Sequence, residues 1–233
     1  MKISDILLSN IKPLWDEAAD KNFVIQMAEG TLDINSFKKY MIQDYLYLFD
    51  YIEILNDIKA LSKNDDISEF LEATIREVEE ELKRVHIPNM EKLGIKVVDI
   101  QKSVQNEVFK EYVSYMKSCA EEYGMIAGLI SLLQCSWCYA YIAKKVCEKY
   151  SKEIANSSYK DWFEAYTCKA YIDANQTWID VVDRVCMNIA KSEIDKMVEI
   201  FKECAVYENK IWDSLLYGRR IVGAVSCSIG SQV

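Results

Sequence analysis

Three helical segments of this chain each place one chemically reactive side chain where the helical repeat predicts a buried hydrophobic residue. The three residues are Asp44, Cys135 and Glu208. Apolar residues precede and follow each of them at steps of three and four, so each lies on the face that its helix turns toward other helices. A buried ionised carboxylate is costly unless it is paired, hydrogen-bonded or neutralised. We therefore predict a pocket inside a helical bundle, lined by two acids, a thiol and tyrosines.

The helix face that carries Asp44 is rich in aromatic rings. Along the chain it reads Phe37, Tyr40, Asp44, Tyr47, Tyr51 and Leu55. Tyrosines at helical spacing are usually core residues whose hydroxyl reaches solvent or a carbonyl group. A carboxylate among such rings also suits a flat, nitrogen-rich heterocycle, which can stack on a phenol ring while its amidine-like edge hydrogen-bonds to the acid.

Cys135 is the candidate nucleophile, on a face shared with Leu132, Tyr139 and Ile142. The ordinary alternative is a structural role, because buried free cysteines behave as small hydrophobic residues. A thiol becomes nucleophilic where neighbouring groups favour its thiolate form. Cys138 completes a C-x-x-C pattern, but a redox function needs a thioredoxin-like context and a zinc site needs a second pair. The sequence shows neither.

Metal ligands are scarce in this sequence. The single histidine, His86, follows the acidic run at 79–81. Helical di-iron proteins need two Glu-x-x-His segments, and only one histidine is present. A histidine near a helix end is usually a cap or a surface residue, and we expect His86 to be one of these. We predict neither a metal nor another cofactor.

The composition predicts an all-α protein with a helical-bundle architecture. Of the 233 residues 51% are hydrophobic, and the 7 glycines and 2 prolines are too few for the turns of a many-stranded β protein. No repeat or linker divides the chain. We expect one domain over residues 1–217 and a loosely held tail over 218–233, where the amphipathic pattern ends.

Charge and hydrophobicity limit the partners of the protein. The formal net charge of −9 argues against a nucleic-acid-binding surface and against anionic membranes. The N-terminus carries an acid within a short apolar stretch, unlike a signal peptide, and no run approaches the roughly 20 apolar residues of a spanning helix. The 8 cysteines fit free thiols in a reducing cytoplasm.

Capping residues and helix breakers predict the boundaries of the helices. The expected helices are 4–19 with a kink or early break at Pro13, 23–29 ending at Gly30, 35–61 capped by Asn35, 65–85, 98–122, an apolar helix from Gly124 to about 150, 162–190 with a break near 173–175, and 192–217.

The reactive residues lie in motifs that resemble the TenA / thiaminase II family, over nearly the whole chain up to about Tyr217. The motifs are Gln43-Asp44-Tyr45-Leu46-Tyr47-Leu48, Cys135-Ser136-Trp137-Cys138-Tyr139, Trp162 with Tyr166, and Glu208 with Trp212. The resemblance implies a haem-oxygenase-like, all-helical fold that uses no haem, and a homotetramer. It also implies hydrolysis of thiamine, and of 4-amino-5-aminomethyl-2-methylpyrimidine, to the hydroxymethyl-pyrimidine of thiamine salvage.

The same resemblance implies a role for each site residue. Cys135 would be the nucleophile on the pyrimidine ring, Glu208 the proton donor and acceptor, and Asp44 the group that binds the aminopyrimidine edge. The positions that would line the pocket are Tyr47, Tyr112, Tyr139 and Tyr166. Two residues depart from the family pattern: Gln134 stands where proline is common, and Ile211 where an aromatic residue is common. Both departures bear on substrate preference more than on chemistry.

Three other functions compete with this interpretation. One is a helical oxidoreductase of the same architecture, either cofactor-free or di-iron, although the single histidine counts against the metal form. Another is a regulatory protein, although no basic recognition helix is visible. The third is a non-catalytic protein that binds the thiamine pyrimidine. Ammonia release from the aminomethyl-pyrimidine, measured alongside Cys135→Ser, would separate them.

Overall fold

The computed structural model describes residues 2–216, except for the side chains of residues 97, 99 and 101. Of the described residues 85% are helical and none lies in a strand, so the all-α prediction is confirmed. The helices are α1 (Ile3–Ala19), α2 (Asn22–Glu29), α3 (Ile34–Leu61), α4 (Asp65–Glu81), the π-helical turn η1 (Leu82–His86), α5 (Ile87–Lys92), α6 (Val97–Lys102), α7 (Glu107–Tyr123), α8 (Met125–Lys149), α9 (Ser151–Ile154), α10 (Lys160–Thr167), α11 (Lys169–Val185) and α12 (Lys191–Leu215).

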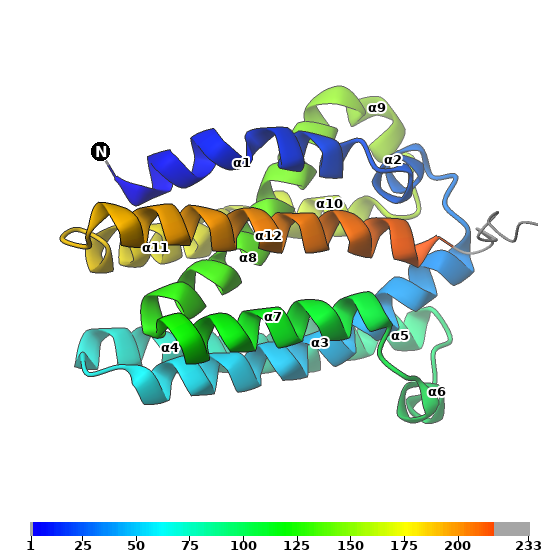
Figure 1. Ribbon diagram of the computed structural model, residues 1–233. Coiled ribbons are helices and arrows are strands. Elements are labelled where there is room, and N and C mark those ends of the chain that lie inside the picture. The colour runs from blue at the N-terminus through cyan, green and yellow to red at the C-terminus, as the bar shows by residue number, and fades with distance from the viewer. Residues whose placement is uncertain (1, 217–233) are drawn as a thin grey trace, which may run out of the picture.

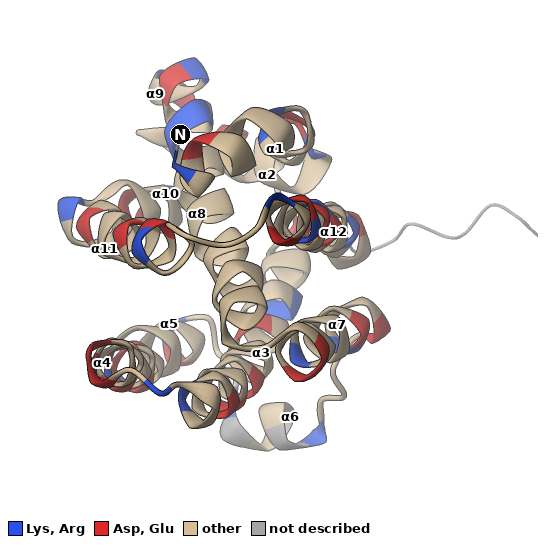
Figure 2. Cartoon of the chain, turned by 60° about the vertical axis from the view of Figure 1, so that its left-hand side comes forward, with Lys and Arg blue, Asp and Glu red and all other residues tan. Residues whose placement is uncertain are grey.

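Helix α8 lies between two layers of helices (Figures 1 and 2). One layer contains α1, α2, α10, α11 and α12, and the other contains α3, α4 and α7. Helix α8 packs against members of both layers, including α3, α7, α11 and α12. A helix that is apolar on nearly all sides needs this central place, because each of its faces must be covered.

Side-chain caps and one glycine set several helix ends. Asp33, not Asn35 as expected, begins α3, because its carboxylate accepts hydrogen bonds from the backbone N–H groups of Asn35 and Ser36. Gly30 ends α2 as predicted, with the left-handed φ of 71° that glycine adopts without strain. Helix α1 continues through Pro13 without the break that we considered.

The single helix expected over 98–122 is wrong, because residues 103–106 separate α6 from α7. Asn106 caps α7 by accepting a hydrogen bond from the N–H of Val108. Gln43 on α3 holds this connection: its amide donates to the Val104 carbonyl over 3.1 Å, and its oxygen accepts from the Asn106 N–H over 2.5 Å. A contact between residues so far apart in the chain leaves no local pattern, so the break could not be predicted.

The break expected near 173–175 is also wrong, because the chain breaks at Cys168 instead. Cys168 has an extended backbone (φ −66°, ψ 152°) between α10 and α11. The polar residues that suggested a break are satisfied inside α11, where Asp173 pairs with Lys169 one turn earlier and the Asn175 amide donates to the Tyr171 carbonyl. Residues 217–233, including the expected tail over 218–233, lie outside the described residues.

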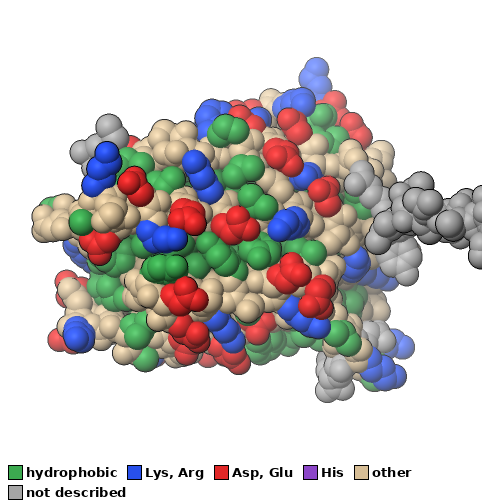
Figure 3. Space-filling model, viewed as in Figure 1, with side chains coloured by type: hydrophobic (Ala, Val, Ile, Leu, Met, Phe, Trp, Pro, Cys, Tyr) green, Lys and Arg blue, Asp and Glu red, His purple; other side chains and the backbone are tan. Residues whose placement is uncertain are grey.

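By length and composition alone, α8 could cross a membrane, which the sequence interpretation did not expect. Its most apolar stretch is 61% buried inside the structure, as expected of a core helix. On the face shown in Figure 3, acidic and basic side chains are interspersed, and no large field of one sign forms. All seven cysteines within 2–216 are free thiols, as predicted.

Candidate active site

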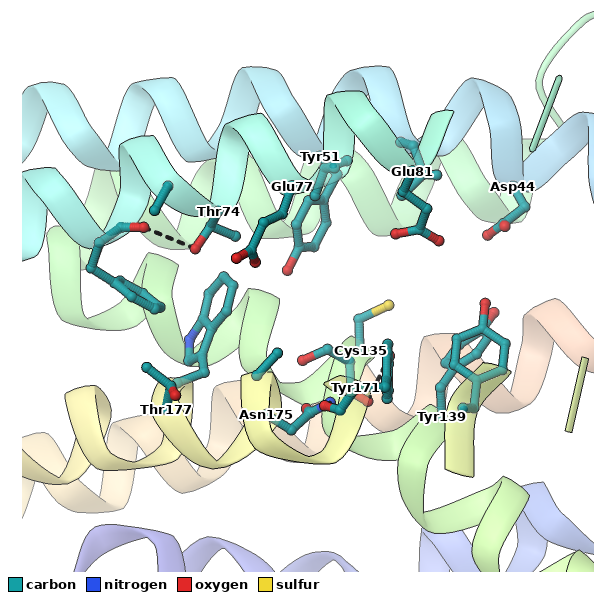
Figure 4. A pocket seen from close by; sticks show the side chains of 18 residues that line it. Asp44, Tyr51, Thr74, Glu77, Glu81, Cys135, Tyr139, Tyr171, Asn175 and Thr177 are labelled. Atoms are coloured by element: carbon teal, nitrogen blue, oxygen red, sulfur yellow. Dashed lines mark hydrogen bonds between the residues drawn. The ribbon is translucent and has the colours of Figure 1, made fainter. Parts of the chain in front are cut away.

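A cavity of about 310 Å³ lies where α3 and α4 face α8 and α11 (Figure 4). Asp44, Tyr51, Glu77 and Glu81 form one wall, and Cys135 lies opposite them. The other lining residues are Leu48, Phe70, Ala73, Thr74, Val78, Ser136, Tyr139, Tyr166, Tyr171, Ala174, Asn175, Thr177 and Trp178. Polar and aromatic side chains from four long helices therefore converge on one space.

The structure brings four of the predicted site residues to this cavity. These are Asp44, Cys135, Tyr139 and Tyr166. The other three, Tyr47, Tyr112 and Glu208, are buried and do not line the cavity. Tyr47 and Glu208 interact with the Cys135 thiol. These two side chains therefore lie in the core directly behind a residue that lines the cavity.

Glu208 and Cys135 both favour their uncharged forms. Burial raises the pKa of Glu208 to about 8, against hydrogen bonds with Cys135 and Tyr112 that lower it. Burial also raises the pKa of the Cys135 thiol well above its usual value, and the nearby charge of Glu208 raises it further. One carboxylate oxygen of Glu208, Oε2, has no hydrogen-bond partner within residues 2–216. An acid with this pKa can take and return a proton near neutral pH.

A stack of tyrosine rings lies next to this pair. The rings of Tyr47 and Tyr112 are nearly parallel, 11° apart with centroids separated by 6.1 Å, and Tyr207 continues the stack at 5.5 Å from Tyr112. The Tyr112 hydroxyl donates a hydrogen bond to Gln134 Oε1 over 3.0 Å. Gln134, the departure from the family pattern, thus holds the Tyr112 hydroxyl in place.

Asp44 is paired with His86, which the sequence interpretation did not predict. His86 was expected at a helix cap or the surface, but it is buried, and its Nε2 lies 2.8 Å from Asp44 Oδ2. The π-helical turn η1 directs this ring inward, and such turns occur often at functional sites. Burial lowers the pKa of His86, but the hydrogen bond and charge of Asp44, with Glu81, raise it above its ordinary value overall. His86 can therefore hold one Asp44 oxygen and leave the other for a ligand.

Two further acids, Glu77 and Glu81, reach the cavity wall from α4 and were not predicted as site residues. They are four residues apart, so they lie on one helix face with Phe70, Ala73 and Thr74. Burial raises the pKa of Glu81, and the charge of Asp44 raises it further, while His86 lowers it. The spacing of four residues between the two acids could have indicated a shared helix face. An acidic run on a charged helix is, however, typical of a face exposed to solvent.

A second cavity of about 670 Å³ adjoins the first. Asp44, Glu81, Tyr166 and Tyr171 line both. His86, Lys92 and Trp162 are among the residues that line only the second. Within residues 2–216, no three His, Cys, Asp or Glu side chains gather in a way that could hold a metal ion.

The fold and the cavity define a class: an all-helical protein of haem-oxygenase-like fold with a small-molecule site built around a thiol and carboxylates. The sequence model of the TENA/THI-4/PQQC family matches residues 8–217. The chain belongs to this family.

Named relatives and a solved structure agree with this membership. An aminopyrimidine aminohydrolase of Helicobacter pylori is 28% identical over 91% of this chain and 98% of its own length. An aminopyrimidine aminohydrolase of Halalkalibacterium halodurans is 26% identical over 95% of this chain and 98% of its own length. The structure of a TenA homologue from P. horikoshii OT3 matches with a TM-score of 0.79 at 23% identity, covering 92% of this chain and 98% of that one.

Proposed function

We propose that the protein is an aminopyrimidine aminohydrolase that acts in thiamine salvage. In this reaction 4-amino-5-aminomethyl-2-methylpyrimidine and water give the hydroxymethyl-pyrimidine and ammonia, and the thiamine cation and water give the same pyrimidine, a neutral thiazole and a proton. The names of the two relatives support this reaction. The observation that carries the proposal is that Asp44 and Cys135 line one cavity while Glu208 adjoins the thiol.

The pyrimidine binds between Asp44 and Cys135. Because Asp44 Oδ2 accepts from His86, Oδ1 is the oxygen that accepts from the exocyclic amino group of the substrate. Hydrogen bonds to an ionised acceptor are about twice as strong as neutral ones, so this contact selects the aminopyrimidine edge. Tyr139 and Tyr166, with ring centroids 5.0 Å apart, add an aromatic wall on the same side of the cavity.

Proton transfer between Cys135 and Glu208 makes the chemistry possible. Ionised Glu208 takes the thiol proton as the sulfur adds to a ring carbon and breaks aromaticity. The ring electrons then expel the group on the methylene carbon, and Glu208 gives its proton to the leaving amine. Two easier steps replace one direct displacement at an aromatic methylene, which is the advantage of covalent catalysis.

Water completes the cycle at the exposed methylene carbon. Its oxygen bonds to that carbon while Glu208 takes a proton, and the carbon–sulfur bond then breaks to restore the aromatic ring. Glu208 returns the proton to the Cys135 thiolate. Each cycle therefore consumes one water and leaves both protein groups in their starting forms.

Ammonia release from the aminomethyl-pyrimidine tests this function directly. The parent protein should release ammonia with turnover, and Cys135→Ser should lose most of that turnover while it keeps the fold, because the change in volume is small. Cys147→Ser is a matched control, since Cys147 is on the same helix and lines neither cavity. Near-normal activity of Cys135→Ser would exclude the covalent mechanism, and binding without turnover in the parent would favour a binding protein.

We propose further that the protein is a cytoplasmic homotetramer that binds neither nucleic acid nor membranes. The net charge of −9 supports the absence of a nucleic-acid surface. Family resemblance supports the tetramer. Sedimentation equilibrium at micromolar concentration would test it, and a monomer there would exclude it.

A further inference from the structure

The first cavity extends past Cys135 into a region that is not needed for the release of ammonia from the aminomethyl-pyrimidine. Figure 4 places Thr74 and Thr177 at one end and Asp44 and Tyr139 at the other, with Cys135 between them. We call the first end the distal arm, and it is lined by Phe70, Ala73, Thr74 and Glu77 from α4 and Asn175, Thr177 and Trp178 from α11. Ala73 precedes Glu81 by eight residues, or about 12 Å along a helix.

The distal arm offers hydrogen-bond acceptors. Glu77 contributes a carboxylate at its solvent-exposed side. Asn175 is only 6% exposed, and its Oδ1 has no hydrogen-bond partner within residues 2–216. Because Asn175 Nδ2 donates to the Tyr171 carbonyl over 3.1 Å, the amide orientation is fixed and the unpartnered atom is the oxygen. A buried acceptor without a partner is costly, which indicates that a ligand donor belongs there.

Aromatic rings and acidic charge complete the distal arm. Phe70 and Trp178 meet edge to face, with ring centroids 5.3 Å apart. The Trp178 indole N–H donates to the Leu129 carbonyl over 3.2 Å, so this ring is held in position. Among residues 2–216, the cavity lining includes Asp44, Glu77 and Glu81 and no lysine, arginine or histidine. Aromatic rings together with carboxylates are the surroundings that favour an organic cation.

We propose that the distal arm binds the leaving group of the substrate when that group is a cationic aromatic ring carrying a hydroxyl donor, such as the thiazolium half of thiamine. This proposal rests on the proposed function, which places the pyrimidine at Asp44 and Cys135. Glu77 faces the positive charge, Asn175 Oδ1 accepts from the donor, and Phe70 and Trp178 contact the ring. Ammonia is too small to reach the arm, so the arm affects one substrate and not the other.

The test compares kcat/KM for thiamine and for the aminomethyl-pyrimidine in two variants. Glu77→Gln removes the charge, and because Glu77 is exposed to solvent we expect a loss of about fivefold for thiamine. Ala73→Leu fills the arm far from the reacting atoms, and should lower kcat/KM for thiamine by about tenfold or more. Both variants should stay within about twofold of the parent for the aminomethyl-pyrimidine, by the usual size of substitutions remote from a reacting centre.

Matched controls come from the same helices and neighbours. Glu79→Gln removes an equal charge from an exposed site on α4 that lines neither cavity, and Ala60→Leu adds equal bulk at an exposed site on α3. Both should leave the two substrates unaffected.

Three results would overturn the distal arm as a leaving-group subsite. The first is an equal loss for both substrates in Glu77→Gln and Ala73→Leu, and the second is no loss for either. The third is a parent protein that hydrolyses the aminomethyl-pyrimidine but not thiamine, which would leave the aminohydrolase part of the proposed function intact. If the parent hydrolysed neither, the proposed function would fail as well.

Discussion

At the scale of single residues, the proposed nucleophile, Cys135, and the proposed acid–base group, Glu208, both favour their uncharged forms. The carboxyl of Glu208, with a pKa of about 8, lies beside the partly exposed Cys135 thiol, and at neutral pH each group mostly keeps its own proton. Only the form with ionised Glu208 can take the thiol proton. That form is a minor fraction at pH 7 and grows as the pH rises through 8.

The pH profile of kcat/KM should therefore rise through about pH 8 on its acid side, because kcat/KM reports the pKa values of the free enzyme. Glu208→Gln cannot exchange this proton, so it should lose about 10²–10⁴ in kcat and lose that limb of the profile. Steady-state kinetics between pH 6 and 9.5 would measure both. A raised KM with an unchanged kcat would instead make Glu208 a binding residue only.

The stability of the same variant provides an independent control. The pKa of Glu208 is higher in the folded protein than its ordinary 4.5, so its contribution to stability is full below pH 4.5 and is lost as the pH rises to about 8. Glu208→Gln does not titrate. The unfolding free energy of the parent should therefore fall relative to that of Glu208→Gln as the pH rises from 4.5 to 8. Above pH 8 the difference between the two proteins should stay constant.

Asp44 should determine affinity for the pyrimidine half of the substrate. Leaving the aminopyrimidine edge of the ligand unpaired in a buried site should cost about 2–5 kcal/mol of binding in Asp44→Ala. Asp44→Asn keeps one acceptor and should lose less. Calorimetric titration with the hydroxymethyl-pyrimidine would measure this, with thermal unfolding to show that each variant is folded. Equal affinity of Asp44→Ala and the parent would refute the role.

The sequence predicted the placement of Asp44 and Glu208 because burial of a helix face follows from residue spacing alone. Both are buried, at 7% and 1% exposure. The prediction that His86 lies at a helix cap or the surface was wrong. A π-helical turn rotates the side chains that follow it relative to an α-helical repeat, and the sequence does not reveal such a turn. The distal arm was missed because its acid and its amide come from two helices about a hundred residues apart.

At the scale of helices, the site depends on the close approach of α3, which carries Asp44, to α8, which carries Cys135. Gly128 on α8 permits this approach. A Cβ atom there would lie 2.6 Å from Ile58 Cγ1 and 2.8 Å from Ile58 Cδ1, and Ile58 is fully buried. Helix α8 therefore has no room for a side chain at position 128 unless Ile58 or one of the two helices shifts.

Gly128→Ala should therefore lower the unfolding free energy. Overpacking costs about 1–3 kcal/mol, and the better helix propensity of alanine returns up to about 1 kcal/mol, so we expect a net loss of about 1–2 kcal/mol. Urea unfolding would measure it. Adding Ile58→Ala removes the opposing atoms, so the double variant should lose less than the sum of the two single variants. Simple additivity would show that the crossing is not the cause.

Several ends of the long helices could be predicted from local signals, such as the glycines that end α2 and α7. The loop over 103–106 could not be predicted, because Gln43 satisfies its backbone from a helix about sixty residues earlier. The break at Cys168 is similar, since the polar residues that suggested another position are satisfied within their own helix.

At the scale of the whole molecule, the N-terminal end of the chain is tied to α11. Asp183 accepts hydrogen bonds from the backbone N–H and the hydroxyl of Ser4, at 3.0 Å and 2.9 Å, and forms an ion pair with Lys2 at 3.2 Å. Its side chain is 8% exposed. This contact joins residues 179 positions apart. Helix α1 packs against α8, α11 and α12, so the contact between Ser4 and Asp183 helps to hold together the layer that covers one side of α8.

Asp183→Ala should weaken the whole fold and leave the chemistry unchanged. Loss of the carboxylate leaves the Ser4 N–H, at the start of α1, without its acceptor, which costs about 1–3 kcal/mol for a buried donor. Urea unfolding should show this loss, while kcat/KM at a temperature well below unfolding should match that of the parent, because Asp183 lines neither cavity. Asp180→Ala is the matched control: its side chain is 60% exposed and 4.0 Å from Lys2, so it should change stability by less than about 0.5 kcal/mol. Equal losses in the two variants would show that α11 merely tolerates alanine poorly, and that the contact with Ser4 contributes nothing of its own.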